Sequence, residues 1–343
     1  MAELYFHQKV WSNETSEYER HRIPGMIVTK SGTILIYNEA RRTGSDWALM
    51  DIFLQRSTDG GRTFGERIYL ARGNEQYHTV NNPVMAQDPD GRIHFLHCED
   101  YSVNGGRVLY RYSDDDGETW SDPRDITDAT LPGYRNAFAL GPGHGICTKD
   151  GVLLFPIWMV PKAYERAIHD HGPSVISVLY SKDRGETWQM GDIMRGSPDA
   201  PTPNETTVTE TSDGRIYLNA RIGAKYRASA WSDNGYCHFT TLTGDHALTD
   251  PICFGSTATY NHGGKHRILF ANCDTDKARD HVTVRVSCDD GKSFPVKKLI
   301  DETRGGYVEI AVNNSTGVIY VLYEEQAGVN CYLTAFDLDW LEE

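Results

Sequence analysis

One eight-residue pattern, Ser-x-Asp-x-Gly-x-Thr-Trp, recurs along the chain and constrains its fold more than any other feature. Four near-complete copies lie at 57–64, 113–120, 181–188 and 287–294. A fifth, eroded copy is expected with Trp231 in the serine position and with Asp233 and Gly235 in place. The copies start 50 to 68 residues apart, so a chain of 343 residues holds about six such units.

Each copy has the features of a β-hairpin turn. Strand-like runs such as DIFLQR, RVLYRY and VTVRV precede the copies, and extended stretches follow them. Asp and Ser side chains accept hydrogen bonds from nearby backbone N–H groups, and glycine adopts positive φ without a Cβ clash. Hairpins repeated at this interval predict an all-β fold, a six-bladed β-propeller that spans 1–343 as a single domain. The only helical segment expected is a turn at 161–170.

Composition restricts the partners of the chain. Its formal charge is −14, because 48 Asp and Glu residues outnumber 34 Lys and Arg residues, which argues against general affinity for nucleic acid or an anionic membrane. The first residues lack a charged segment followed by an apolar run, and no stretch of about 18 apolar residues occurs. We therefore expect a cytoplasmic protein that binds neither nucleic acid nor membrane. No feature of the sequence indicates an oligomeric state.

The cysteines favour a reducing compartment. There are seven of them, an odd number, without a Cys-x-x-Cys pair, and most lie in apolar strand-like runs such as IHFLHC and ILFANC. This usage predicts buried free thiols. The His-Asp-His run at 169–171 is a weak basis for a metal site, and a solvated loop is the favoured interpretation.

Short segments with chemically useful side chains are spread over the whole chain. They are centred on Arg22, on Arg41, Arg42 and Asp46, on Glu205, on Arg221, on Arg279, on Tyr307 and on Glu324. Alone, each has an ordinary structural explanation, because most arginines form surface ion pairs and most tyrosines pack at strand ends. Asp46 in particular lies in a polar loop, RRTGSDW, where a solvated carboxylate is the default.

Taken in this order, the segments resemble the exo-α-sialidase (neuraminidase) family over nearly the whole chain. The eight-residue repeats resemble the Asp boxes, or BNR repeats, of that family and of several unrelated propellers, where the carboxylates are structural. The resemblance implies a retaining exo-glycosidase that hydrolyses the terminal α-linked sialic acid, or a related 2-keto acid sugar, of a sialylated glycan or oligosaccharide.

The resemblance also implies roles for individual residues. The arginines that bind the substrate carboxylate would be Arg22, Arg221 and Arg279, with Glu324 supporting Arg22. Asp46 would be the acid/base residue, and Glu205 with Tyr307 would form the nucleophile pair. Arg41 fits a contact to a substrate hydroxyl, although Arg42 could compete for that role.

The implied chemistry is physically coherent. A 2-keto acid sugar carries its carboxylate on the anomeric carbon, and a guanidinium presents a fixed fork of donors to such a group. A carboxylate nucleophile would be repelled there, whereas a tyrosine hydroxyl is neutral until it attacks, and sialidases are an exception to the two-carboxylate pattern. Because the ordinary pKa of tyrosine is about 10, Tyr307 needs a base, which Glu205 supplies. No metal or cofactor is required.

Two positions depart from the family pattern. Where a substrate-contacting aspartate is common before proline, this chain has Asn81-Asn82-Pro83, so that Asn82 would contact substrate with an amide. Val308-Glu309 follows Tyr307 where small polar residues are commoner, and Glu309 beside the nucleophile puts the fine substrate preference in doubt. The glycines of the run at 141–146, Gly-Pro-Gly-His-Gly-Ile, are interpreted as backbone geometry near the site.

Two alternatives stay open. The same core could act on deaminated or eight-carbon keto acid sugars, because an arginine triad binds the carboxylate and not the N-acyl group. A different class of function, a non-catalytic propeller that binds glycans or proteins, is compatible with the repeats alone. Such a binding module has no reason to keep Tyr307, Glu205 and Asp46 together.

Overall fold

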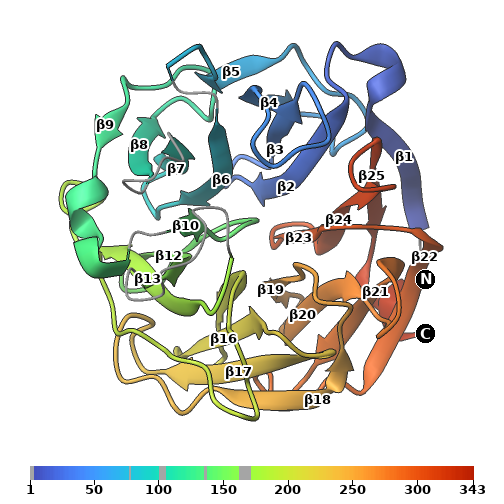
Figure 1. Cartoon of the computed structure of the whole chain (residues 1–343). Helices are drawn as coiled ribbons and strands as arrows, with labels where there is room; N and C mark the ends of the chain where they lie inside the picture. Colours follow the sequence, from blue (N-terminus) through green and yellow to red (C-terminus); the bar gives the residue numbers. More distant parts are fainter. Residues whose placement is uncertain (1–3, 77–78, 100–105, 135–136, 162–170) are drawn as a thin grey trace.

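The computed structural model describes residues 4–76, 79–99, 106–134, 137–161 and 171–343. Within these ranges six small antiparallel sheets surround a common axis, which confirms the predicted six-bladed β-propeller (Figure 1). Chain order and blade order coincide, since each sheet is built from consecutive strands, except that the last sheet also includes the first strand of the chain.

The strands are grouped as follows. Blade 1 contains β2 (Arg20–Val28), β3 (Ile34–Arg41), β4 (Met50–Ser57) and β5 (Ile68–Arg72), and blade 2 contains β6 (Val80–Gln87), β7 (Ile93–Glu99), β8 (Arg107–Ser113) and β9 (Arg124–Asp125). Blade 3 contains β10 (Ala137–Leu140), β11 (Ile146–Cys147), β12 (Leu153–Val160), β13 (Val175–Ser181) and β14 (Gln189–Met190), and blade 4 contains β15 (Thr206–Glu210), β16 (Ile216–Arg221), β17 (Tyr226–Ser232) and β18 (Thr243–Thr249). Blade 5 contains β19 (Ser256–His262), β20 (Lys265–Cys273), β21 (Asp280–Ser287) and β22 (Val296–Arg304), and blade 6 contains β23 (Val308–Asn313), β24 (Val318–Glu325), β25 (Asn330–Phe336) and β1 (Leu4–Ser12).

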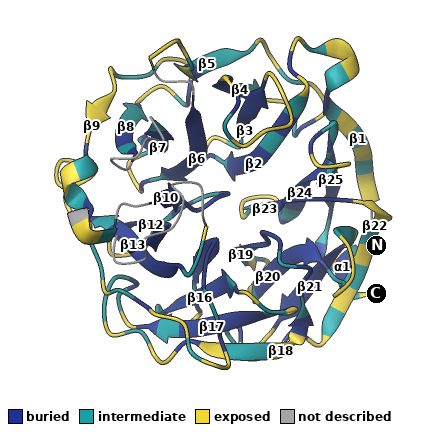
Figure 2. Ribbon diagram, in the orientation of Figure 1, coloured by how far each residue is buried: buried dark blue, intermediate teal, exposed yellow. Residues whose placement is uncertain are grey.

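Burial explains why these segments form strands. The second strands β3 and β12 are buried at every position, because each blade packs against a neighbour on both of its faces. Apolar side chains from blades 3 and 4, such as Leu154 and Leu218, share one core cluster. The outermost strands β1, β9 and β18 are far more exposed, and Figure 2 shows this gradient from the centre to the rim.

The repeated boxes are the turns between the third and fourth strands of a blade. In the first box, Ser57 Oγ accepts a hydrogen bond from Gly61 N at 2.9 Å, and Asp59 Oδ1 accepts one from Thr63 N at 3.0 Å. The corresponding serine and aspartate oxygens accept the same backbone bonds in the boxes that begin at Ser113, Ser181 and Ser287. The box carboxylates therefore close turns.

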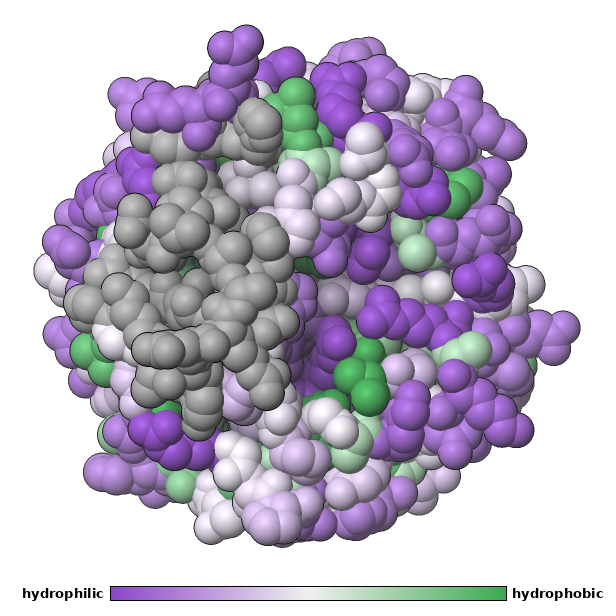
Figure 3. Space-filling model, viewed as in Figure 1, coloured by the Kyte–Doolittle hydropathy of each residue, from purple (hydrophilic) through white to green (hydrophobic). Residues whose placement is uncertain are grey.

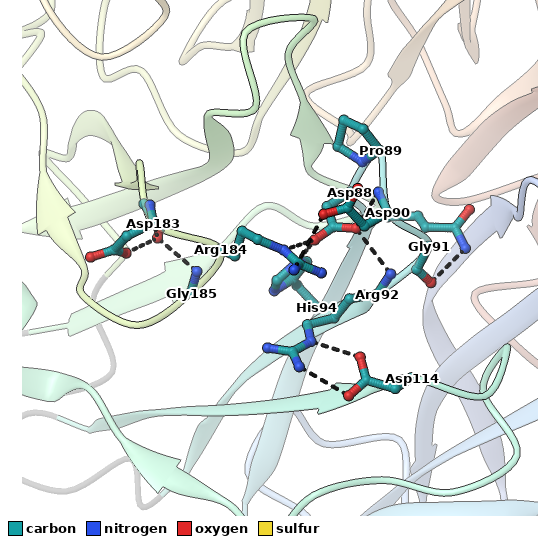
Figure 4. A network of polar contacts seen from close by, with 12 residues as sticks. Asp88, Pro89, Asp90, Gly91, Arg92, His94, Asp114, Asp183, Arg184 and Gly185 are labelled. Atoms are coloured by element: carbon teal, nitrogen blue, oxygen red, sulfur yellow. Dashed lines mark hydrogen bonds and ion pairs between the residues drawn. The ribbon is translucent and has the colours of Figure 1, made fainter.

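Each box also joins its blade to the preceding one. In the third box Arg184, with φ of +59°, donates from Nε to Asp88 Oδ2 at 2.9 Å, and Asp88 lies in the turn between β6 and β7 of blade 2 (Figure 4). The fully buried imidazole of His94 lies between Asp88, at 3.4 Å, and the Tyr110 hydroxyl, at 2.9 Å. A Cβ at Gly185 would overlap that hydroxyl, so this position requires glycine for space as well as for its φ of +84°.

The fifth box begins one residue later in the chain than predicted. Ser232, not Trp231, occupies the serine position, and its Oγ accepts from Gly235 N at 2.9 Å. Asn234, not Asp233, occupies the aspartate position, because its Oδ1 accepts from the backbone N–H groups of the next residues at 3.1 and 3.0 Å. The turn is one residue shorter than the others, and an amide oxygen replaces the carboxylate, so alignment to Asp233 was wrong.

The first strand of the chain closes the ring. β1 pairs antiparallel with β25 from Leu4 opposite Phe336 to Ser12 opposite Asn330, with register shifts between Leu4 and Phe6 and between Lys9 and Trp11. A short helix, α1 (Leu338–Glu342), follows β25 and packs beside β22. Within the described residues no helix is long and apolar enough to span a bilayer. The turn predicted at 161–170 lies almost entirely outside those residues.

The cysteines are free as predicted, but not all of them are buried. All seven cysteines are free. Four of them, Cys98, Cys253, Cys273 and Cys331, are buried. Cys147 and Cys237 are half-buried, and Cys288 is exposed because it occupies the second position of a box turn.

Candidate active site

The predicted site residues meet at one end of the central channel. Because neighbouring strands are antiparallel, the beginnings of the inner strands and the ends of the second strands lie at this same end. Arg22 lies near the beginning of β2, while Arg41, Arg221 and Glu324 lie at or near the ends of β3, β16 and β24. Figure 3 shows hydrophilic residues around the hollow near the centre of this face.

Two β-bulges aim side chains into the channel. The pairing of β2 with β3 is irregular between Arg22 and Gly25, where Ile23 has φ of +55°. The pairing of β6 with β7 is irregular between Asn81 and Val84, where Asn82 has φ of +51°. A proline follows the left-handed residue in both places. Bulges of this kind commonly re-orient a side chain next to a binding site.

A cavity of about 170 Å³ opens at this end. Its lining includes every residue proposed to bind or react, namely Arg22, Arg41, Asp46, Asn82, Glu205, Arg221, Arg279 and Tyr307. Residues that sequence reasoning did not assign to the site complete the lining: Ile23, Glu39, Trp47, Asn81, Trp158 and His171.

The three arginines surround one phenol. The guanidinium carbons of Arg22 and Arg279 lie 5.1 and 5.6 Å from the ring centroid of Tyr307. Arg221 Nη1 donates to the Tyr307 hydroxyl at 3.4 Å. The three guanidinium groups come from blades 1, 4 and 5, and Tyr307 precedes β23 of blade 6. The fold therefore gathers three positive charges at one point of an acidic protein.

Glu324 connects Arg22 to the segment that carries Tyr307. This fully buried carboxylate accepts from Arg22 Nε at 2.8 Å and from Ile23 N at 2.9 Å. Its second oxygen accepts from Tyr307 N at 3.2 Å. A Cβ at Gly306 would overlap that oxygen, so the glycine before Tyr307 allows the close approach. Glu324 thus fixes an arginine and the backbone of the tyrosine relative to one another.

Tyr307 is hydrogen-bonded to a carboxylate. Its hydroxyl donates to Glu205 Oε1, and Arg221 Nη1 donates to Glu205 Oε2 at 2.6 Å. Burial and the Glu205 charge raise the pKa of Tyr307 well above its ordinary value, while Arg221, Arg279 and Arg22 act in the opposite direction. The arginines alone therefore do not ionise the phenol, and a base is required.

Asp46 and Arg41 form a second charged group at the edge of the cavity. Arg41 is buried, donates to Glu39 Oε2 at 2.9 and 2.6 Å, and also donates to Asp46. Burial raises the pKa of Asp46, but the charges of Arg41 and Arg22 outweigh that effect and the pKa is lowered. The Asp46 side chain is 54% exposed, so solvent reaches it.

The structure separates Arg41 from Arg42. Arg41 lines the cavity, whereas the Arg42 side chain is 42% exposed and lies over the Tyr18 ring, 4.4 Å from its centroid. Of these two residues, Arg41 is therefore the one placed to meet a ligand.

The Asn81-Asn82 pair lies where the sequence comparison expected a substrate contact. Both asparagines line the cavity, and Asn82 N donates to Glu39 Oε1 at 2.6 Å. Asn81 Oδ1 is buried without a hydrogen-bond partner in the described part of the chain.

Sequence reasoning missed an aromatic side of the cavity. The His171 ring lies 5.3 Å from that of Trp158 and 6.3 Å from that of Trp47. Trp158 is 5% exposed, and its run LLFPIWMV reads as an ordinary core strand. His171 was assigned to a solvated loop, and although it is exposed, it lines the cavity. The available signal was the position of Trp47 directly after Asp46.

Glu309 lies elsewhere than its place in the sequence suggested. It is fully buried and does not line the cavity, although it lies only two residues after Tyr307. Its nearest partner is His144 of the Gly-Pro-Gly-His-Gly-Ile run, with Nδ1 2.5 Å from Oε1. No three His, Cys, Asp or Glu side chains are grouped to hold a metal ion in the ranges described.

Sequence comparisons identify relatives of the chain. A family model described as a BNR repeat-like domain matches residues 66–321. The chain is 30% identical to an exo-alpha-sialidase of Arthroderma benhamiae, over 94% of this chain and 85% of the relative. It is also 30% identical to a sialidase of Micromonospora viridifaciens, over 98% of this chain but only 54% of that protein. The chain thus spans about half the length of the Micromonospora relative.

Solved structures share the fold. The Hadza microbial sialidase Hz136 superposes with a TM-score of 0.82 at 25% identity, over 95% of this chain and 67% of that one. A Trypanosoma rangeli sialidase in complex with 2,3-difluorosialic acid, a covalent intermediate, superposes with a TM-score of 0.76 at 17% identity, over 99% of this chain and 60% of that one.

Proposed function

The chain belongs to the BNR-repeat sialidase family, and on that basis we propose that it is a retaining exo-α-sialidase with Tyr307 as its nucleophile. The observation that carries the proposal is the junction of Tyr307, Glu205 and three arginines in one cavity. These residues come from four different blades, and a non-catalytic propeller would gain nothing by bringing them together.

Substrate binding begins with the carboxylate on the anomeric carbon. Arg22, Arg221 and Arg279 present guanidinium donors to it, and two of them are held in place by Glu324 and Glu205. Arginines paired with buried carboxylates keep a fixed orientation, so they position the sugar ring over the phenol.

Tyr307 then attacks the anomeric carbon. Its raised pKa keeps it neutral before the reaction, which avoids repulsion of the substrate carboxylate. As the bond from the phenol oxygen to the anomeric carbon forms, Glu205 accepts the hydroxyl proton through the hydrogen bond already present. The bond to the leaving oxygen breaks, and a glycosyl-tyrosine intermediate results.

Asp46 serves as acid and then as base. The charge of Arg22 contributes to the low pKa of Asp46, and a bound substrate carboxylate offsets part of that charge, so binding raises the pKa. The protonated acid then gives its proton to the leaving oxygen. In the second step the solvent-exposed carboxylate removes a proton from water, which attacks the same carbon. The bond from that carbon to the Tyr307 oxygen breaks, and Glu205 returns its proton to the phenol. Two displacements at one carbon retain the configuration.

The substrate class is a glycan ending in an α-linked sialic acid. Deaminated and eight-carbon keto acid sugars share the anomeric carboxylate, and the arginine triad would bind them equally. A panel of 4-methylumbelliferyl α-glycosides, with N-acetylated, deaminated and eight-carbon sugars, distinguishes these substrates.

The decisive experiment measures release of 4-methylumbelliferone by the wild type and by Tyr307→Phe, with the first product anomer identified by NMR. We expect release of the α-anomer by the wild type and a loss of roughly a hundredfold or more in kcat for Tyr307→Phe. Equal turnover by both proteins would rule out the nucleophile. An inert wild type that binds sialylated glycans would favour the non-catalytic propeller.

A further inference from the structure

Glu309 lies inside the channel, directly behind the site. It follows Tyr307 by two residues and belongs to β23, the inner strand of blade 6, whose label lies close to the centre of the ring in Figure 1. The carboxylate of Glu309 is fully buried and lies outside the cavity that Tyr307 lines.

The Glu309 carboxylate connects three blades. Its Oε1 accepts from Ser256 Oγ of β19, in blade 5, at 3.0 Å, and from Ile310 N of its own strand at 3.1 Å. The same oxygen lies 2.5 Å from Nδ1 of His144, in blade 3. Its Oε2 has no hydrogen-bond partner in the described part of the chain. Gly143 leaves room for that oxygen, because a Cβ there would overlap it.

His144 borders a second cavity and not the one that holds the candidate site. Its ring, with an 11% exposed side chain, lines a larger cavity of about 510 Å³ bounded by the other ends of the inner strands. Its backbone is fixed, because Gly145 N donates to Met85 O at 2.9 Å and Tyr37 donates to Gly143 O at 2.8 Å. Between this pair and the site lies Phe254, whose ring centroid is 5.7 Å from that of Tyr307.

We propose that Glu309 and His144 are positioning residues for Tyr307, and that their ion pair anchors the strand after the nucleophile to the opposite side of the channel. The inference rests on the proposed function, since it concerns the same tyrosine. Neither Glu309 nor His144 lines the substrate cavity. Phe254, whose ring contacts that of Tyr307, lies between the pair and the site. The pair acts by holding the Tyr307 hydroxyl within hydrogen-bond distance of Glu205 and Arg221.

Charge gives the pair a pH dependence. Burial lowers the pKa of His144, but the Glu309 carboxylate raises it more, so the pKa lies above its ordinary value. The other titratable groups around the pair are Tyr37 from β3, beside Glu309, and five residues that line the larger cavity: Lys30, Asp88, Cys147, Lys149 and Glu210. Loss of the His144 proton leaves a buried carboxylate without a cation, which loosens the anchor.

The test follows inactivation by 2,3-difluorosialic acid. In that reaction Tyr307 forms a bond to the anomeric carbon, fluoride leaves with its electron pair, and Glu205 takes the proton, so acid catalysis by Asp46 is not needed. We expect Glu309→Gln and His144→Gln to lower the first-order inactivation rate about tenfold or more with the inhibitor constant changed less than about threefold. The double variant should recover part of the rate, because no buried charge remains unpaired.

The control and the pH profile complete the test. Glu210→Gln removes a carboxylate at the larger cavity and should inactivate like the wild type. The wild-type rate should fall at alkaline pH as His144 deprotonates, and the double variant should lack that fall. If the inhibitor inactivates both single variants at the wild-type rate, the inference is wrong. It is also wrong if the inactivation rate falls only in step with a lowered Tm and its pH profile is unchanged. If Tyr307→Phe is inactivated as fast as the wild type, the proposed function itself fails.

Discussion

The hydroxyl of Tyr307 donates a hydrogen bond to Glu205, a carboxylate 102 residues away in the sequence. The two residues belong to different blades, and Arg221 holds the second oxygen of the same carboxylate. This contact gives a phenol of raised pKa an acceptor for its proton, as the proposed role of Tyr307 requires.

Replacing Glu205 with Gln should therefore remove most of the activity. The amide keeps the shape and accepts a hydrogen bond but takes no proton, so we expect kcat to fall about a hundredfold or more. The measurement is steady-state hydrolysis of a fluorogenic α-sialoside, with Glu210→Gln on the same blade as the control. Retention of more than a tenth of the wild-type kcat by Glu205→Gln would exclude its role as base.

Replacing Asp46 with Asn should affect substrates according to their leaving group. A sugar leaving group needs the proton, so we expect a loss of about a hundredfold or more, whereas an acidic phenol should lose about tenfold or less. In the wild type, kcat on the sugar substrate should fall as pH rises through the pKa of Asp46 in the complex, because the acid must be protonated. Equal losses on both substrates would contradict the assignment.

Replacing Arg22 with Met should reduce stability much more than replacing Arg279 with Met. Arg22 is paired with Glu324, which is fully buried, so its loss leaves an unpaired charge and should cost about 3–5 kcal/mol of stability. Arg279 donates to the Ile252 carbonyl at 3.2 Å and has no carboxylate in ion-pair range among the residues described. Its loss should change stability by less than about 1 kcal/mol and raise KM about tenfold or more. Urea unfolding and steady-state kinetics check both outcomes.

Replacing a box glycine with alanine should destabilise the fold through side-chain overlap as well as through backbone strain. Gly185→Ala combines a φ of +84° with overlap of the buried Tyr110 hydroxyl, so we expect a loss of about 2–5 kcal/mol. Gly151→Ala has a similar φ of +78° with no atom within 4 Å and should lose only about 1 kcal/mol. Chemical unfolding measures the stability of both variants. Similar losses of stability in Gly185→Ala and Gly151→Ala would show that backbone strain alone causes them. Activity per folded molecule should not change in either.

Acid should destabilise the fold through buried histidines. Burial lowers the pKa of His94 to about 4, against about 6.5 when unfolded, although Asp88 acts in the opposite direction. Below pH 6.5 the unfolded state binds a proton that the folded state excludes, so stability falls as pH falls. This group accounts for about 2–3 kcal/mol between pH 7 and pH 4.5. His94→Gln should be less stable than the wild type at pH 7. Between pH 7 and pH 4.5, however, its free energy of unfolding should fall by about 2–3 kcal/mol less than that of the wild type. An unchanged dependence of stability on pH would contradict the assignment.

The repeats predicted the architecture because turn chemistry is local. Serine and aspartate oxygens close each box within a few residues, so spacing alone marked the blades. The fifth box was misaligned because Asn234 performs the same task in a shorter turn, and only its hydrogen bonds identify it. Blade 6, in contrast, has no box among its described residues, and its outer strand comes from the other end of the chain.

The charged part of the site could also be anticipated, whereas its aromatic part could not. Arginines before a bulge or at a strand end are conspicuous in a sequence, but Trp158 lies in a run that is apolar at nearly every position. Whether such a tryptophan faces a core or a cavity depends on the packing of blades. The burial of Glu309 likewise depends on His144, which is far away in sequence but adjacent across the channel.

Closure of the ring by β1 gives the blade beside the site a rim strand from a distant part of the sequence. Glu324 belongs to this sheet and Tyr307 directly precedes its inner strand β23, while the rim strand Leu4–Ser12 is held by its pairing with β25. The other blades are each built from consecutive strands and do not depend on that pairing. Detachment of β1 should therefore loosen the sheet next to Tyr307 before it affects the other five blades.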